Sequence, residues 1–183
     1  MYKIKKHYTT KENLLEVCKE CAKEKGINGF GMRDVAYSSG LALGTIYNYF
    51  ADKESMIIET LVSIWKEFIS SIPNTESFIE YLESIINIID DIEKAYPNFI
   101  KNHPRHITDS KVEKAKELMT RELQSIKEQI INALNNDKSI RKNVFNSVLT
   151  KESLARFTIK NILSAKNKED KDVLLQIVKC AIY

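Results

Sequence analysis

Hydroxyl, amide and cationic side chains gather between residues 33 and 53, where carboxylates are few. They are Arg33, Thr45, Tyr47, Asn48, Tyr49 and Lys53. Hydroxyl and amide groups donate hydrogen bonds to phosphate oxygens, and their apolar parts can lie against base edges. An ammonium or guanidinium group adds attraction for a polyanion. These residue types therefore indicate a surface for nucleic acid.

Two short helices are expected to position these side chains. Apolar residues recur at helical spacing over 32–39, and Gly40 then offers the permissive backbone that a tight turn between helices needs. A second helical period begins at Leu43, with Ile46 and Phe50 four residues apart on an inner face. The pattern is typical of a helix-turn-helix, whose second helix enters the major groove of DNA.

The stretch Gly44-Thr45-Ile46-Tyr47-Asn48-Tyr49-Phe50, followed by Asp52-Lys53-Glu54, resembles the signature of TetR-family (tetracycline-repressor-like) transcriptional regulators. The resemblance covers residues 9–61. It implies that five residues touch DNA, mostly at phosphates: Arg33, Thr45, Tyr47, Tyr49 and Lys53. With their neighbours on the second helix, the expected DNA-binding set is Arg33, Ala42, Leu43, Gly44, Thr45, Tyr47, Asn48, Tyr49 and Lys53.

The sequence departs from the family pattern at both helix starts. Gly31 stands where the family often has a capping Ser or Thr, so that hydroxyl is missing. Ala42 and Leu43 stand where the second helix often opens with Ser-Lys. One hypothesis is that both apolar side chains contact thymine methyl groups, the apolar feature of the major groove. Replacing thymine by uracil would then weaken binding.

Composition predicts an all-α fold. The chain has 183 residues with 43% hydrophobic and 29% charged residues, and only 5 Gly and 3 Pro. We expect an N-terminal three-helix DNA-binding head over residues 1–53 and a helical regulatory and dimerisation domain over 54–183. The head holds nine Lys/Arg and six Asp/Glu, so it carries the whole net charge of +3. A basic excess in the segment with the motif fits a nucleic-acid partner.

The protein is expected to be cytoplasmic and not to associate with membranes. No apolar run reaches the roughly 18 to 20 residues of a membrane span, and the first residues have no apolar signal core. Three cysteines, an odd number, argue against a disulfide framework.

Apolar spacing predicts five further helices. Their approximate bounds are 52–72, 76–94, 108–135, 152–165 and 171–183. The resemblance implies a bundle that dimerises through its last two helices, and the last segment is apolar on more than one side, which supports a homodimer. Such a dimer would read a near-palindromic operator whose half-sites lie about 34 Å apart along the duplex.

The resemblance also implies a cavity for a small-molecule effector in the bundle. Candidate lining residues are Trp65, Phe68, Phe78, Tyr81, Phe99, Met119 and Phe145. Aromatic residues at helical spacing are more often plain core. The expected function is repression, with release from DNA when the ligand selects a conformation that spaces the recognition helices wrongly.

Other functions stay open on particular residues. Cys18 and Cys21 could join His103 and His106 in a metal site, which would make the protein a metal-responsive regulator. Both cysteines also fit an apolar core stripe. A helical interaction module is a third possibility, and it would show no salt-dependent DNA binding. The chain has no nucleophile elbow, phosphate-binding glycine loop or Glu-x-x-His pair, so we expect no enzyme and no cofactor.

Overall fold

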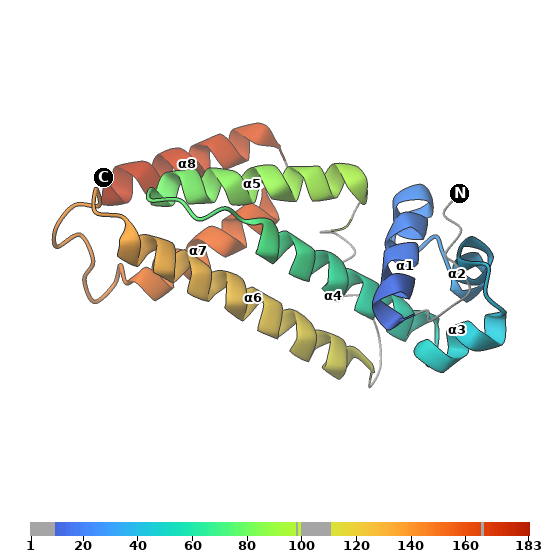
Figure 1. The fold of residues 1–183 in the computed structure, drawn as a ribbon. Coiled ribbons are helices and arrows are strands. Elements are labelled where there is room, and N and C mark those ends of the chain that lie inside the picture. Colours follow the sequence, from blue (N-terminus) through green and yellow to red (C-terminus); the bar gives the residue numbers. More distant parts are fainter. Residues whose placement is uncertain (1–9, 98, 100–110, 166) are drawn as a thin grey trace. The chain divides into compact units, whose positions relative to one another are not determined.

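A computed structural model describes residues 10–97, 99, 111–165 and 167–183. Within these ranges the chain forms helices and no strand, so the all-α prediction is confirmed. The helices are α1 (Lys11–Lys25), α2 (Met32–Ser39), α3 (Leu43–Tyr49), α4 (Lys53–Ser71), α5 (Phe78–Ala95), α6 (Lys111–Asn136), α7 (Lys151–Ser164) and α8 (Lys168–Ile182) (Figure 1). None of the helices in the described ranges combines the length and the apolar character that a bilayer crossing needs.

The chain divides into two compact units. The first comprises Met1–Glu67 and Asp91–Met119, and the second comprises Phe68–Asp90 and Thr120–Tyr183. Helices α4, α5 and α6 each continue from one unit into the other. The division of function at residue 53 stays a prediction.

The first unit gathers α1, α2 and α3 around the start of α4 (Figure 1). Apolar residues three or four apart on each helix meet in one small core, where burial of apolar surface stabilises the packing. The fully buried members are Leu14, Cys18, Ala22, Val35, Ile46, Phe50 and Met56. Ile27 and Phe30, in the connection between α1 and α2, are 1% exposed and close this core.

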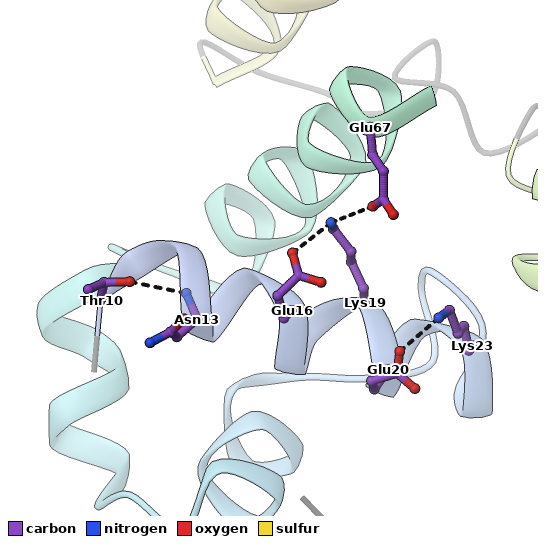
Figure 2. Close-up of polar contacts among 7 residues, drawn as sticks. All are labelled: Thr10, Asn13, Glu16, Lys19, Glu20, Lys23 and Glu67. Carbon is purple, nitrogen blue, oxygen red and sulfur yellow. Dashed lines mark hydrogen bonds and ion pairs between the residues drawn. The ribbon is translucent and has the colours of Figure 1, made fainter. Parts of the chain in front are cut away.

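Helix α1 begins one residue later than the sequence pattern indicates. The capping-box spacing of Thr9 and Glu12 predicts Thr9 as its N-cap. Instead, Thr10 is the N-cap, and its Oγ1 accepts a hydrogen bond from the backbone N–H of Asn13 at 3.3 Å (Figure 2). Thr9 itself lies outside the described residues. Two adjacent threonines give nearly the same capping signal, so the sequence alone does not separate them.

The second unit contains α7, α8 and most of α5 and α6. Its fully buried apolar residues come from all four helices: Phe78, Leu82, Ile130, Ala155, Val178 and Ile182. Helices α7 and α8 pack on each other as the last antiparallel pair of the chain. Their starts are capped by Thr150 and Asn167, whose side chains accept from Ser153 N and Asp170 N. The predicted pair of final helices is therefore confirmed, and α8 begins three residues before the expected position.

A buried carboxylate joins three segments of the second unit. Asp137 is 7% exposed and accepts from the backbone N–H of Phe78 at 2.8 Å, from Ser139 at its N–H and hydroxyl, and from the hydroxyl of Tyr183. Burial by itself would raise the pKa of Asp137, but these hydrogen bonds outweigh it, and the pKa lies below its ordinary value. Asp137 therefore fixes the start of α5 to the ends of α6 and α8.

Candidate nucleic-acid interface

The turn between α2 and α3 depends on the backbone conformation of Gly40. Gly40 has φ +70° and ψ 20°, the left-handed conformation that glycine adopts at no steric cost. The N–H of Leu41 donates to the carbonyl of Ala36 at 3.2 Å, and the N–H of Gly40 donates to the carbonyl of Tyr37 at 3.3 Å. These bonds close α2 and direct the chain into α3, as the sequence predicts.

Helix α3 has one buried face and one face in solvent. Ile46 and Phe50 are fully buried, which confirms the predicted inner face. Tyr47 is 52% exposed, and Asn48 is exposed beside it. Thr45 and Tyr49 are half-buried at the edges of the helix. The outer face therefore offers a phenol and an amide to a partner, without a carboxylate on the helix.

The start of α3 is accessible. Ala42, its N-cap, is exposed, and Leu43 is half-buried. Gly44 is exposed, and a Cβ atom added to it would meet no atom within 4 Å. The fold thus does not require glycine at position 44. The space beside its backbone is available to an outside molecule.

Cationic side chains lie close to the start of α2. Arg33 is exposed in the first turn of α2, and Lys53 is exposed at the first position of α4. The ammonium of Lys53 donates to the carbonyl of Asn28 at 3.3 Å, and a Cβ atom added to Gly31 would lie 3.8 Å from Lys53 Cδ. Lys53 and the N-terminus of α2 are therefore neighbours, and both favour an anion.

Asp34 supplies the capping interaction that Gly31 lacks. Its Oδ2 accepts from the Gly31 N–H at 2.8 Å, and its Oδ1 pairs with the Lys25 ammonium at 2.5 Å. The Lys25 ammonium, followed by the Gly31 N–H, lowers the pKa of Asp34 below its ordinary value. Lys25 thus offsets the one negative charge of α2, next to the surface formed by Arg33 and Lys53.

Among the described residues of α1, α2 and α3, one exposed aromatic side chain is not indicated by the sequence pattern. Tyr37, on α2, is 87% exposed. It lies four residues after Arg33, so both side chains share one face of α2. Helical spacing leaves Tyr37 opposite the buried residues Val35 and Ala36, but the family resemblance assigns it no role.

The cysteine pair of α1 belongs to the core. Cys18 and Cys21 are free thiols, 0% and 3% exposed. Burial raises the pKa of Cys18 to about 12 and also raises the pKa of Cys21, which disfavours the thiolate that a metal needs. Among the described residues no three His, Cys, Asp or Glu side chains are grouped to hold a metal ion. His103 and His106 lie outside the described residues.

Five of the seven predicted pocket residues are buried in the two cores. Trp65, Phe68, Phe78, Tyr81 and Phe99 are each at most 4% exposed. Trp65 and Phe99 belong to the first unit, whereas the other three belong to the second. Phe145 is half-buried, and the side chain of Met119 lies outside the described part of the structure. The effector site therefore stays a prediction.

A groove of about 560 Å³ lies along α7 and α8, away from all seven residues. Most of its surface is apolar. Its walls are Leu149, Ser153, Leu154, Arg156, Phe157, Lys160, Ile177, Val178 and Ala181. Three large apolar residues on these helices are about half exposed: Phe157 at 44%, Val173 at 52% and Ile177 at 50%. We call this groove and the three exposed residues the α7–α8 face.

The N-terminal helices match a known family. Residues 14–60 fit the profile described as "Bacterial regulatory proteins, tetR family". This range contains α1, α2, α3 and the first part of α4. No match was found among curated protein sequences.

Solved structures share the fold over nearly the whole chain. GusR of Salmonella enterica is 18% identical, with 99% of each chain covered and a TM-score of 0.66. A TetR-family regulator of Streptomyces coelicolor is 13% identical, with 94% of this chain and 80% of that chain covered and a TM-score of 0.66. FadR of Bacillus subtilis, solved with stearoyl-CoA, is 15% identical, with 95% of this chain and 100% of that chain covered and a TM-score of 0.63.

Proposed function

Because its DNA-binding head places this chain in the TetR family of bacterial regulatory proteins, we propose that it represses transcription as a ligand-responsive homodimer on a near-palindromic operator. The family consists of DNA-binding regulators rather than enzymes. The DNA contacts proposed are those that the sequence indicates: Arg33, Ala42, Leu43, Gly44, Thr45, Tyr47, Asn48, Tyr49 and Lys53.

The observation that carries the DNA-binding proposal is the two-sided character of α3. Ile46 is fully buried, which fixes the helix, while Tyr47 and Asn48 point away from the core into solvent. Gly44 leaves room for a phosphate to approach the backbone. Arg33 and Lys53 flank this surface with positive charge.

The proposed dimer forms through the α7–α8 face. Phe157, Val173 and Ile177 are large apolar side chains, each about half exposed on adjacent helices. A monomer that left them in water would forgo the free energy of burying them. A two-fold dimer would cover the same patch on both subunits and place two heads on successive half-sites.

The proposed effector is a small molecule that binds the helical region and favours a conformation with lower DNA affinity. Support comes from FadR of Bacillus subtilis, which was solved with stearoyl-CoA and shares the fold. The seven aromatic and apolar residues named from sequence remain its candidate lining.

The decisive test is selection of DNA from a random pool by the purified protein, at two salt concentrations. We expect an enriched near-palindrome with half-sites about one helical turn, roughly 34 Å, apart. Binding should weaken steeply with salt, because phosphate contacts release counterions. The absence of an enriched sequence, together with binding that does not respond to salt, would refute the proposal.

A further inference from the structure

Helix α1 carries a buried lysine at the point where α4 leaves the first unit. Lys19 has a side chain only 7% exposed, although its ammonium is charged. It pairs with Glu16 of α1 at 2.8 Å and with Glu67 of α4 at 2.7 Å (Figure 2). Glu67 is the last residue of α4 in the first unit, and Phe68 begins the second. The Lys19–Glu67 ion pair therefore holds α1 to α4 where the chain passes between units.

A second α1 lysine contacts the chain where it returns to the first unit. The chain re-enters this unit at Asp91, and Tyr96 follows directly after α5. The ammonium of Lys23, one turn after Lys19, lies 5.7 Å from the centre of the Tyr96 ring, within the range of a cation–π contact. Helix α1 thus contacts α4 at its last residue in the first unit and also contacts the segment that follows α5.

Aromatic packing strengthens the same region. Phe99 is 1% exposed, and its ring centre lies 5.5 Å from that of Trp65 in α4 and 6.1 Å from that of Tyr96. These rings bind the segment after α5 to α4 within the first unit. The Lys19–Glu67 pair acts on the same helix, two residues after Trp65.

We propose that Lys19 is a positioning residue that, through Glu67, sets the separation of DNA half-sites that the dimer prefers. The inference rests on the proposed function. In a dimer, the distance between two recognition helices depends on the angle at which α1, α2 and α3 are held on α4. The Lys19–Glu67 ion pair restricts that angle within the first unit, so one spacing is favoured over its neighbours.

The chain offers a matched pair of variants. Glu67→Ala and Glu16→Ala each remove one carboxylate from the same lysine, and the two carboxylate side chains are almost equally exposed, at 68% and 67%. Glu67→Ala breaks the ion pair between α1 and the last residue of α4 in the first unit and leaves the Lys11–Glu59 pair between the same helices intact, whereas Glu16→Ala breaks a contact within α1. Both change the net charge equally, so non-specific attraction to DNA changes equally.

The measurement is affinity for synthetic operators whose half-sites stand at the selected separation or are moved by one or two base pairs. The quantity compared is the affinity for the operator with the preferred spacing divided by the affinity for a shifted one. We expect Glu67→Ala to reduce this affinity ratio by about threefold to tenfold, equivalent to about 0.7–1.4 kcal/mol. Glu16→Ala should keep the wild-type ratio. A loss of folding stability alone would weaken binding at all spacings and leave the ratio unchanged.

A third variant tests whether a changed affinity ratio could result from misfolding. Lys19→Met keeps the length of a buried side chain and removes its charge, an exchange that proteins often tolerate. It should melt near the wild-type temperature and show the reduced ratio of Glu67→Ala. The inference would be overturned if Glu67→Ala and Lys19→Met kept the wild-type affinity ratio. It would also be overturned if Glu16→Ala lowered that ratio as much as Glu67→Ala. Either result would leave the proposed function intact. A wild-type protein that selects no DNA would overturn both.

Discussion

Two regions of the described chain expose large apolar side chains, and they differ in the kind of side chain. On the head these residues are Tyr37 and Tyr47, which end in a hydroxyl. On α7, α8 and the loop before them they are Val148, Phe157, Val173 and Ile177, which have no polar atom. A phenol can bond a phosphate while its ring lies on sugar or base, whereas side chains without a polar atom gain most by contacting each other. The side-chain chemistry thus favours nucleic acid for the head and protein for the α7–α8 face.

The largest expected effect tests the α7–α8 face. Ile177→Glu would place a carboxylate in each half of the proposed dimer interface, where desolvation costs several kcal/mol. We expect the dimer dissociation constant to rise by about 100-fold or more, equivalent to about 3 kcal/mol, and operator affinity to fall with it. Sedimentation equilibrium measures the change. Gln176→Glu adds the same charge next to Ile177 outside the groove walls and should leave the dimer intact.

A second prediction concerns what holds the second unit together. Asp137→Asn replaces one of the two acceptor oxygens by a donor. That donor faces either the Phe78 N–H and the Tyr183 hydroxyl, which both donate to Oδ2, or the N–H and hydroxyl of Ser139, which both donate to Oδ1. Hydrogen bonds to a charged group contribute about 1.5–3 kcal/mol, so we expect a loss of that size in the free energy of unfolding. Chemical denaturation at neutral pH measures it.

The same carboxylate predicts a pH dependence. Because the pKa of Asp137 is lower in the folded protein than its ordinary value, its contribution to stability is present above the ordinary value. The contribution is lost as the pH falls through the lower, folded pKa. Wild-type protein should therefore lose its advantage over Asp137→Asn in strong acid. A stability difference that stayed constant at low pH would contradict this assignment.

A third prediction tests the aromatic region. Tyr47→Phe removes one exposed hydroxyl and leaves the ring, so the fold should be unchanged, while DNA affinity falls by about 0.5–1.5 kcal/mol. Fluorescence anisotropy with the selected operator measures the affinity. Tyr37→Phe is the control, since Tyr37 is exposed on α2 outside the proposed contact set. An equal loss in both would add Tyr37 to the DNA surface, beside Arg33 on α2.

The smallest expected effect separates folding from binding at one residue. Gly44→Ala meets no atom of the protein within 4 Å and replaces a poor helix former, so it should raise the stability of the head by about 0.5 kcal/mol. If a phosphate approaches the backbone there, the added methyl group should weaken DNA binding. Melting temperature and affinity would move in opposite directions. Unchanged affinity would mean that the DNA does not approach Gly44.

Local patterns in the sequence predicted the head well. Gly40 stands between two helical periods, and it adopts the left-handed conformation that the turn requires. Ile46, Phe50, Cys18 and Cys21 repeat at helical spacing, and all four are buried. Such features depend on residues within one or two turns of each other, so they are visible in the order of the residues.

Long-range polar contacts could not be predicted in the same way. The Lys19–Glu67 pair joins residues 48 positions apart, and the bond from Phe78 N–H to Asp137 joins residues 59 apart. Nothing in the spacing of either residue identifies its partner. The residues of a ligand pocket could not be predicted either. Trp65 or Phe78 has the same helical spacing whether it packs in a core or lines a cavity.

The buried ammonium of Lys19 also bears on how far the head is a separable module. A fragment cut after residue 60, where the family match ends, would contain Lys19 but neither Glu67 nor Trp65. The lysine would keep only Glu16, and the surface once covered by the later turns of α4 would face water. A head transplanted onto another regulator should therefore carry α4 at least through Glu67. The segment that the head needs in order to fold therefore extends beyond residues 14–60, which match the family profile.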